Sequence, residues 1–163
     1  MLDEGPNVEL LDGELVIVNA QGPIHSSLAV HIHRVLERLY GDEHHVRDHS
    51  SVRAGPYSLP EPDVAIVRGE PFAYTKRLPG PKDIVLVVEI SDSTLHRDRR
   101  KADIYAAAGY VNYWLVDVDA RRLEVRTKPQ KDGLYAKIDV LSEEAEVSVP
   151  GTKKSLKVSA LLP

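Results

Sequence analysis

Two segments of the chain carry apolar residues at the spacing of an α-helix. In residues 23–40 these residues recur at helical intervals and Gly41 follows them, which predicts a helix that ends at the glycine. The apolar positions are Leu28, Ile32, Val35 and Leu39. Residues 95–108 predict a second helix, followed by Gly109.

Short apolar runs predict the strands. Residues 8–20 predict a hairpin that turns at Asp12-Gly13, and residues 145–163 predict one more. The other predicted strands cover 44–53, 63–67, 83–90, 111–118, 122–127 and 133–140, and residues 68–82 form a loop. The strand before the second helix and the strand after it form a βαβ unit, which should be right-handed. The pattern predicts an α/β fold with a mixed sheet, two helices and additional antiparallel hairpins, in a single domain over residues 1–163.

The composition is that of an ordinary globular protein. Of 163 residues, 42% are hydrophobic and 28% are charged, and the lack of cysteine excludes disulfides and thiolate metal sites. No apolar run approaches the roughly 20 residues of a membrane span, and the acidic N-terminus is unlike a signal peptide, so we expect a cytoplasmic protein. The net charge of −4 argues against a broad nucleic-acid surface, although a local basic patch or a bound cation would reverse the field at one place.

Glu89 ends a strand that is otherwise apolar. Residues 84–88 are aliphatic, and alternation along the strand places Glu89 on one face with Val85 and Val87. A buried carboxylate costs free energy unless it is compensated. Either the strand emerges into solvent at Glu89, or a neighbouring group or ion holds the charge there.

Asp63 and Lys101 are also charged residues beside apolar ones. Asp63 opens the strand at 63–67 directly after Pro62, where an aspartate most often belongs to a turn or a strand entry. Lys101 lies in the apolar stripe of the second helix, unless its long side chain reaches solvent. That stripe contains Ile104, Tyr105 and Ala108. Together with Glu89, these residues suggest a site of two carboxylates and a lysine.

Two carboxylates and a lysine are the parts that metal-dependent phosphodiester hydrolysis needs. Two carboxylates about 4 Å apart repel each other by roughly 4 kcal/mol at an effective dielectric constant of about 20, and a divalent cation reverses that sign. Mg²⁺ prefers oxygen ligands and typically keeps several waters while it binds one or two carboxylates and a phosphate. The lysine can orient the attacking water. Asp63, Glu89 and Lys101 therefore predict a Mg²⁺ site, which Mn²⁺ can also occupy.

Four segments carry a resemblance to a known family, namely LLDGELVIV (10–18), EPDVAIV (61–67), DIVLVVEISDST (83–94) and RDRRKADIYAAAGYVNYWLVD (97–117). They resemble the Uma-type putative restriction endonuclease family of the PD-(D/E)XK nuclease superfamily. The resemblance runs in order over nearly the whole chain, and the segment ending in YWLVD is its most specific part. It implies a restriction-endonuclease-like sheet flanked by helices and cleavage of DNA that leaves a 5′-phosphate. Superfamily members often pair to cut both strands, so a homodimer is expected.

The resemblance also implies the roles of individual residues. It implies that Asp63 and Glu89 are metal ligands, assisted by the backbone carbonyl of Ile90. In the superfamily's usual pattern a lysine stands two residues after the second acid, where this chain has Ser91. The family supplies its lysine from the following helix, which points to Lys101.

Two further residues are implied near the same cleft, and one segment departs from the family. His25 matches a family histidine near the start of the first helix, and Tyr105 follows the lysine by one turn. Where the family usually has Ser-Pro-Ser, this chain has Ser91-Asp92-Ser93, which loosens the turn and adds an acid. Two functional classes therefore stay open, a Mg²⁺-dependent DNA endonuclease and a catalytically silent binding or assembly module with the same fold. The sequence leaves the choice between DNA and RNA open, and a sugar- or nucleotide-processing enzyme with two carboxylates is a more distant alternative.

Two other polar segments have plainer interpretations. EHHVRDH (43–49) would place His45 and His49 on one face of a strand, but without cysteine or an HExxH spacing a polar surface strand is favoured over a zinc site. HRDRRK (96–101) is the densest basic segment, and either a solvated helix end or contact with a phosphate backbone explains it.

Overall fold

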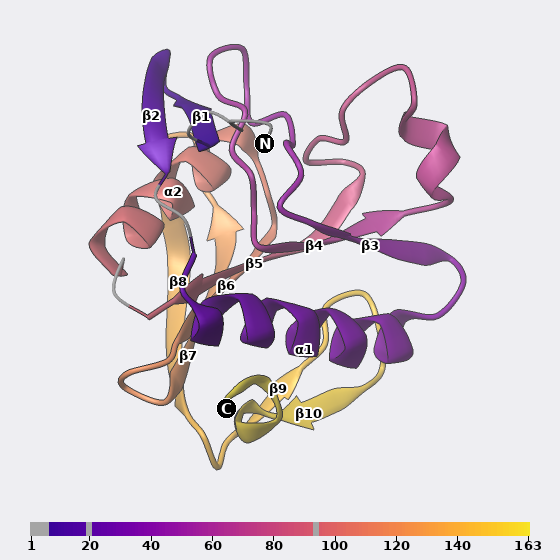
Figure 1. Cartoon of the computed structure of the whole chain (residues 1–163), viewed down its shortest axis with the longest axis vertical. Helices are drawn as coiled ribbons and strands as arrows, with labels where there is room; N and C mark the ends of the chain where they lie inside the picture. The colour runs from indigo at the N-terminus through magenta and orange to yellow at the C-terminus, as the bar shows by residue number, and fades with distance from the viewer. Residues whose placement is uncertain (1–6, 19–20, 93–94) are drawn as a thin grey trace, which may run out of the picture.

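A six-stranded mixed sheet forms the centre of the computed structural model, which describes residues 7–18, 21–92 and 95–163 (Figure 1). The strands follow one another in the order β3-β4-β5-β6-β7-β8. Their bounds are β3 His44–Asp48, β4 Val64–Arg68, β5 Ile84–Ser91, β6 Asn112–Asp117, β7 Arg122–Pro129 and β8 Tyr135–Ser142. β5 and β6 are parallel, as the βαβ pattern predicts, and the other neighbouring pairs are antiparallel.

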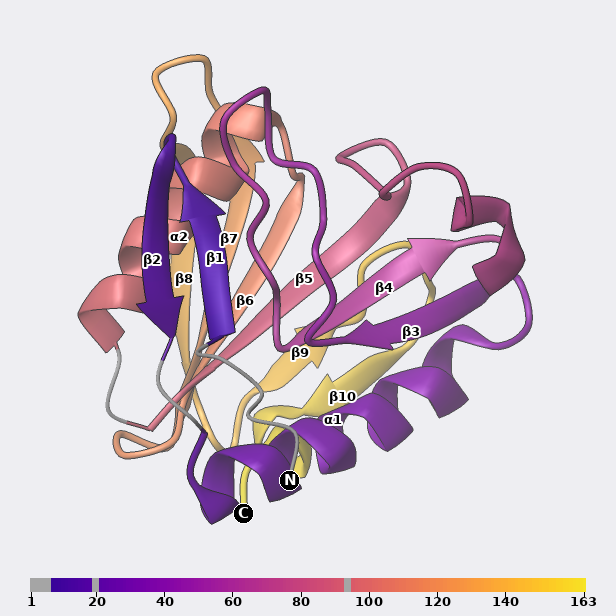
Figure 2. The same cartoon turned by 45° about the horizontal axis from the view of Figure 1, so that its top comes forward.

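The two predicted helices cover opposite faces of this sheet (Figure 2). α1 (Pro23–Tyr40) lies on the same side as the C-terminal hairpin of β9 (Glu146–Ser148) and β10 (Ser155–Lys157). α2 (Leu95–Ala108) lies beside the N-terminal hairpin of β1 (Asn7–Leu11) and β2 (Glu14–Val18). Two 3₁₀ helices complete the chain, η1 (Pro71–Tyr74) in the long loop after β4 and η2 (Val158–Leu161) near the C-terminus.

Both helices and both hairpins form where the sequence predicts them, whereas β3 is shorter than expected. The predicted strand at 44–53 ends at Asp48, because His49 takes a φ of 43° and its amide donates to the carbonyl of Pro62 instead of to a neighbouring strand. No helix within the described ranges is long and apolar enough to cross a membrane.

β5 separates two hydrophobic cores because its side chains alternate between the sheet faces. Leu86, Val88 and Ile90 pack with α1, whereas Val87 packs with α2, and alternation places Glu89 on the α2 side as well. All eight residues of β5 are buried. Glu89 therefore lies under a helix, where the sequence left open that it emerges into solvent.

The predicted shared face of Val85, Val87 and Glu89 is wrong for Val85. Ile66 pairs with Leu86 and Val67 pairs with Ile84, so Val85 is an extra residue in a β-bulge. A bulge of this kind shifts the alternation by one residue, and Val85 belongs to the α1-side core. Strand alternation predicted from sequence alone does not detect such an insertion.

The bulge generates a stability prediction at Gly151. Gly151 has a φ of +75°, and a β-carbon there would lie 3.0 Å from Cγ1 of Val85. Gly69 has the same φ with no atom within 4 Å of its added β-carbon, so it is a matched control. We expect Gly69→Ala to cost about 1–2 kcal/mol of unfolding free energy through backbone strain, and Gly151→Ala to cost about 1 kcal/mol more through overpacking. Urea denaturation measures both, and equal costs would contradict the tight contact at Val85.

Candidate active site

The candidate site lies at one end of the central sheet, where β4 begins and β5 ends. Because β4 and β5 are antiparallel and Val64 pairs with Val88, Asp63 comes level with the end of β5 that carries Glu89. α2 brings Lys101 to this end from one face of the sheet, and the first turn of α1 brings His25. All four side chains are buried.

Lys101 is held between two carboxylates. Its Nζ lies 2.7 Å from Oε1 of Glu89 and 2.9 Å from Oε1 of Glu9, on β1. The hydroxyl of Tyr105, one helical turn after the lysine, donates to the same Glu89 oxygen at 3.1 Å. Glu89 is 2% and Lys101 4% exposed. The strand therefore does not emerge into solvent at Glu89, and the side chain of Lys101 does not reach solvent.

The charges of this cluster are shifted by burial and by one another. Burial raises the pKa of Glu89 well above its ordinary value, and although the Lys101 ammonium lowers it, the lysine does not cancel the effect. Burial alone would lower the pKa of Lys101, but the charges of Glu89 and Glu9 raise it above its ordinary value, so the amine stays protonated at neutral pH. Burial and the neighbouring Glu89 also raise the pKa of Tyr105 well above 10, which keeps its hydroxyl a donor.

Asp63 has a different set of partners. Its Oδ2 accepts a hydrogen bond from the backbone amide of Ile90 at 2.7 Å. Its Oδ1 lies 2.9 Å from Nε2 of His25 and accepts a hydrogen bond from the side-chain Nε2 of Gln21 at 3.0 Å. Burial alone would raise the pKa of Asp63, but the hydrogen bond and charge of His25 bring it below its ordinary value. Burial alone would lower the pKa of His25, and Asp63 raises it instead. At this end of the site His25 and Asp63 are therefore hydrogen-bonded partners, and each shifts the other's pKa towards its charged form.

Glu9 and Gln21 are members of this site that the sequence interpretation missed. Glu9 is 4% exposed and shares the inner face of β1 with buried Leu11. Val8, the residue directly before Glu9, is exposed. That alternation is the signal that could have found it, since an inward glutamate on a hairpin needs a partner. Gln21 offers no comparable pattern, because it stands in the connection before α1.

Ile90 and Asp92, which follow Glu89 in the chain, each contact another residue of the site. Ile90 contacts Asp63 through its backbone amide, and its proposed role as a carbonyl ligand stays a prediction. Asp92, which stands where the family usually has proline, has Oδ1 3.9 Å from Nδ1 of His25. Since Nε2 of the same ring faces Asp63, the imidazole lies between these two acids.

The oxygen donors suit a hard cation, although the side chains are paired with each other. Asp63 and Glu89 offer carboxylate oxygens at one end of the sheet, and burial raises the pKa of Glu89 because the charge of Lys101 offsets it only in part. Within the described parts of the chain, no three His, Asp or Glu side chains are grouped so that they could share a metal ion. The carboxylate oxygens of Asp63 and Glu89 are the donor type that Mg²⁺ prefers, and Mg²⁺ usually binds only one or two protein carboxylates.

The histidine-rich and basic segments have structural partners. His45 bonds the backbone of Gly69 through Nδ1 at 2.6 Å, whereas His49 lies near Asp63, so the two do not form a common face. In the basic segment, Arg99 pairs with the buried Glu124 and Arg100 lies 3.8 Å from Glu14. The pair with buried Glu124 favours a structural role for Arg99. Arg100 and Glu14 are both exposed, so a solvated helix end and contact with a phosphate backbone both stay open for Arg100.

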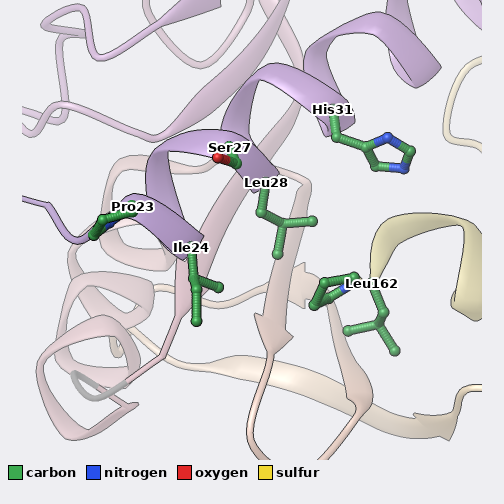
Figure 3. Close-up of a pocket in the computed structure, with 7 residues that line it drawn as sticks. Pro23, Ile24, Ser27, Leu28, His31 and Leu162 are labelled. Carbon is green, nitrogen blue, oxygen red and sulfur yellow. The ribbon is translucent and has the colours of Figure 1, made fainter.

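A hollow beside the first turns of α1 is separate from this site (Figure 3). Its volume is about 470 Å³, and it is lined by Pro23, Ile24, Ser27, Leu28, His31, Leu162 and Pro163. Neither the buried acids nor Lys101 lines it. The hollow is mainly apolar and does not give access to the candidate ligands.

Comparison with known proteins agrees with the fold and the resemblance. The sequence profile of Uma2, described as "Putative restriction endonuclease", matches residues 1–160. A crystal structure described as a putative nuclease belonging to DUF820, from Anabaena variabilis ATCC 29413, superposes with a TM-score of 0.77. The two sequences are 17% identical, and the match covers 96% of this chain and 89% of the other, so the likeness is one of fold. No curated protein matches the chain.

The buried ion cluster generates a pH-dependent stability prediction for Lys101→Met. The pKa of Glu89 is higher in the folded chain than its ordinary value of 4.5, which applies to the unfolded chain. The free energy of unfolding therefore falls as the pH rises above 4.5 towards the folded-state pKa. Removing Lys101 raises the folded-state pKa of Glu89 further and leaves buried carboxylates uncompensated. We expect a loss of about 3–5 kcal/mol at about pH 8 and a smaller loss at about pH 5.

Urea denaturation in EDTA at both pH values measures this effect. Lys153→Met is the control, because Lys153 is exposed and should change stability little at either pH. A loss in Lys101→Met that does not depend on pH would show that the lysine does not set the protonation of Glu89.

Proposed function

Since the chain belongs to the Uma2 family, described as putative restriction endonucleases, we propose that it is a Mg²⁺-dependent endonuclease that hydrolyses phosphodiester bonds in DNA. The observation that carries this proposal is the contact of the Lys101 amine with Glu89 at 2.7 Å, beside Asp63 and away from water. Buried charged groups are costly for stability alone, and their collection at one sheet end favours a chemical role. Nuclease chemistry needs these same groups, namely oxygen ligands for a cation and a cationic donor.

The acids would hold the cation. Asp63 and Glu89 would supply carboxylate oxygens, with the carbonyl of Ile90 as the expected third protein ligand. A bound Mg²⁺ would supply positive charge that stabilises the phosphoryl oxygens as negative charge develops on them. Tyr105 supports this role by donating a hydrogen bond to Glu89, which fixes the carboxylate that it contacts.

When Glu89 turns to the cation, the N–H of Lys101 that faces Glu89 would be free to donate to the attacking water. The pKa of Lys101 lies above its ordinary value, so at neutral pH the side chain is an ammonium that orients water and offsets charge but accepts no proton. Attack of that water would form a new bond to phosphorus and break the bond to the 3′ oxygen. The proton that the water loses would pass to solvent and the 3′ oxygen would take one up, which leaves a 5′-phosphate and a 3′-hydroxyl. His25 would help to keep Asp63 ionised, because its hydrogen bond lowers the pKa of that carboxyl group. Pairing of two copies to cut both DNA strands stays a prediction.

A catalytically silent module is the second candidate, and one observation favours it. The two carboxylate oxygens of Asp63 already face the Ile90 amide, His25 and Gln21, so a cation would have to compete with these donors. The replacement of the family's proline by Asp92 points in the same direction. Such a module would keep the fold and bind a partner without cleaving DNA.

Calorimetric titration with Mn²⁺, together with cleavage of plasmid DNA in Mg²⁺, separates the two candidates. We expect Asp63→Asn and Glu89→Gln each to abolish cleavage and to lower Mn²⁺ affinity by more than roughly 100-fold. Loss of a group that only hydrogen-bonds a metal ligand costs about 10–100-fold, and loss of the ligand itself should cost more. The reason is that each substitution removes a negative oxygen ligand while it keeps the shape of the side chain.

Glu37→Gln and Asp139→Asn are the matched controls. Their carboxylates are 67% and 42% exposed and lie outside the site, so affinity and cleavage should be unchanged. Binding of Mn²⁺ without any cleavage would support the silent module, and binding that survives in Asp63→Asn and Glu89→Gln would exclude both acids as ligands.

A further inference from the structure

We propose that Glu9 is a positioning residue, which holds the Lys101 ammonium in place when the carboxylate of Glu89 engages a divalent cation. This inference rests on the proposed function, and it makes the N-terminal hairpin part of the active site. Nothing in the family match or in the sequence pattern assigns a role to Glu9.

The geometry gives one ammonium two carboxylate partners. Nζ of Lys101 lies 2.9 Å from Glu9 and 2.7 Å from Glu89, and the three side chains are each 5% exposed or less. Glu9 belongs to β1 and Glu89 to β5, so the two acids reach the amine from separate elements. Only one of them, Glu89, stands among the proposed metal ligands.

Glu9 is fixed relative to the segment that leads into Asp63. The oxygen that faces Lys101 also accepts the backbone amide of Glu61 at 2.9 Å, and Lys101 itself donates to the Glu61 carbonyl at 3.3 Å. Three further links hold the hairpin to the same segment. They are the bridge between Leu10 and Leu59, the bond from the Asp12 amide to the Ser58 hydroxyl, and the bond from the Gly13 amide to the Tyr57 carbonyl. The hairpin therefore places Glu9 against the chain two residues before Asp63.

A second carboxylate changes how readily a cation can bind. A buried ammonium that loses its only counter-charge is strongly destabilised, so a lysine paired with Glu89 alone would compete with a cation for that carboxylate. Glu9 removes this competition, because it compensates the ammonium while Glu89 turns to the cation. Lys101 then stays charged and fixed beside Asp63 and Glu89.

The test is a double-mutant cycle on Mn²⁺ affinity with Glu9→Gln, Lys101→Met and the double variant, measured by calorimetry. Glu9→Gln keeps the size and one acceptor oxygen but removes the charge. We expect it to weaken Mn²⁺ binding by roughly tenfold in the wild-type background, and to have little effect in the Lys101→Met background, where no ammonium competes.

Glu14→Gln is the control on the same hairpin. The Glu14 carboxylate is 72% exposed, so this substitution should leave Mn²⁺ affinity unchanged. Urea denaturation in EDTA establishes that each variant folds, and Lys101→Gln takes the place of Lys101→Met if the latter does not.

The outcomes separate this inference from the proposed function. Wild-type protein that binds no Mn²⁺ would overturn the proposed function and the inference together. Wild-type protein that binds Mn²⁺, with an equal loss from Glu9→Gln in both backgrounds, would overturn the inference alone and make Glu9 a ligand. Unchanged affinity in Glu9→Gln would also overturn it alone, because Glu9 would then have no influence on Lys101.

Discussion

The candidate site depends on a single ammonium buried between two carboxylates. Lys101 on α2 contacts Glu89 on β5 and Glu9 on β1, so one charge connects a helix, the central sheet and a hairpin. Charges removed from water are tolerated only when they are paired, and each of these three elements must therefore dock for the charges of the others to be compensated. Burial still raises the pKa of Glu89 although the Lys101 ammonium lowers it, so the lysine offsets only part of the cost of burying that carboxyl group.

The sheet explains why the second acid lies nearby. β4 and β5 run in opposite directions, so Asp63 at the start of one strand meets Ile90 at the end of the other, and the amide of Ile90 donates to Asp63 at 2.7 Å. α1 packs on the opposite face from α2, yet its first turn reaches the same sheet end and brings His25 to Asp63. The candidate site is thus assembled at one end of the sheet, and each acid receives its nitrogen donor from a different helix, Asp63 from α1 and Glu89 from α2.

Much of the fold follows from local signals. The bounds of α1 follow from helical spacing, with Gly41 at a φ of 68° ending it, and the hairpin turn follows from Asp12-Gly13, both at positive φ. These signals act within a few residues and do not need the rest of the chain. The early end of β3 at Asp48 and the bulge at Val85 depend instead on how one strand meets the next, and no pattern within either strand encodes them.

For the site, the sequence by itself placed Glu89 at the end of an apolar strand, Lys101 in the apolar stripe of a helix and Asp63 at the entry to another strand. A strand period and a helix period are sufficient for that, because they fix which face each side chain takes. Only the tertiary structure decided that these residues are buried together and that Glu9 joins them. Glu9 and Lys101 are 92 positions apart, and their contact arises from the docking of a hairpin on a helix, which no periodicity along the chain describes.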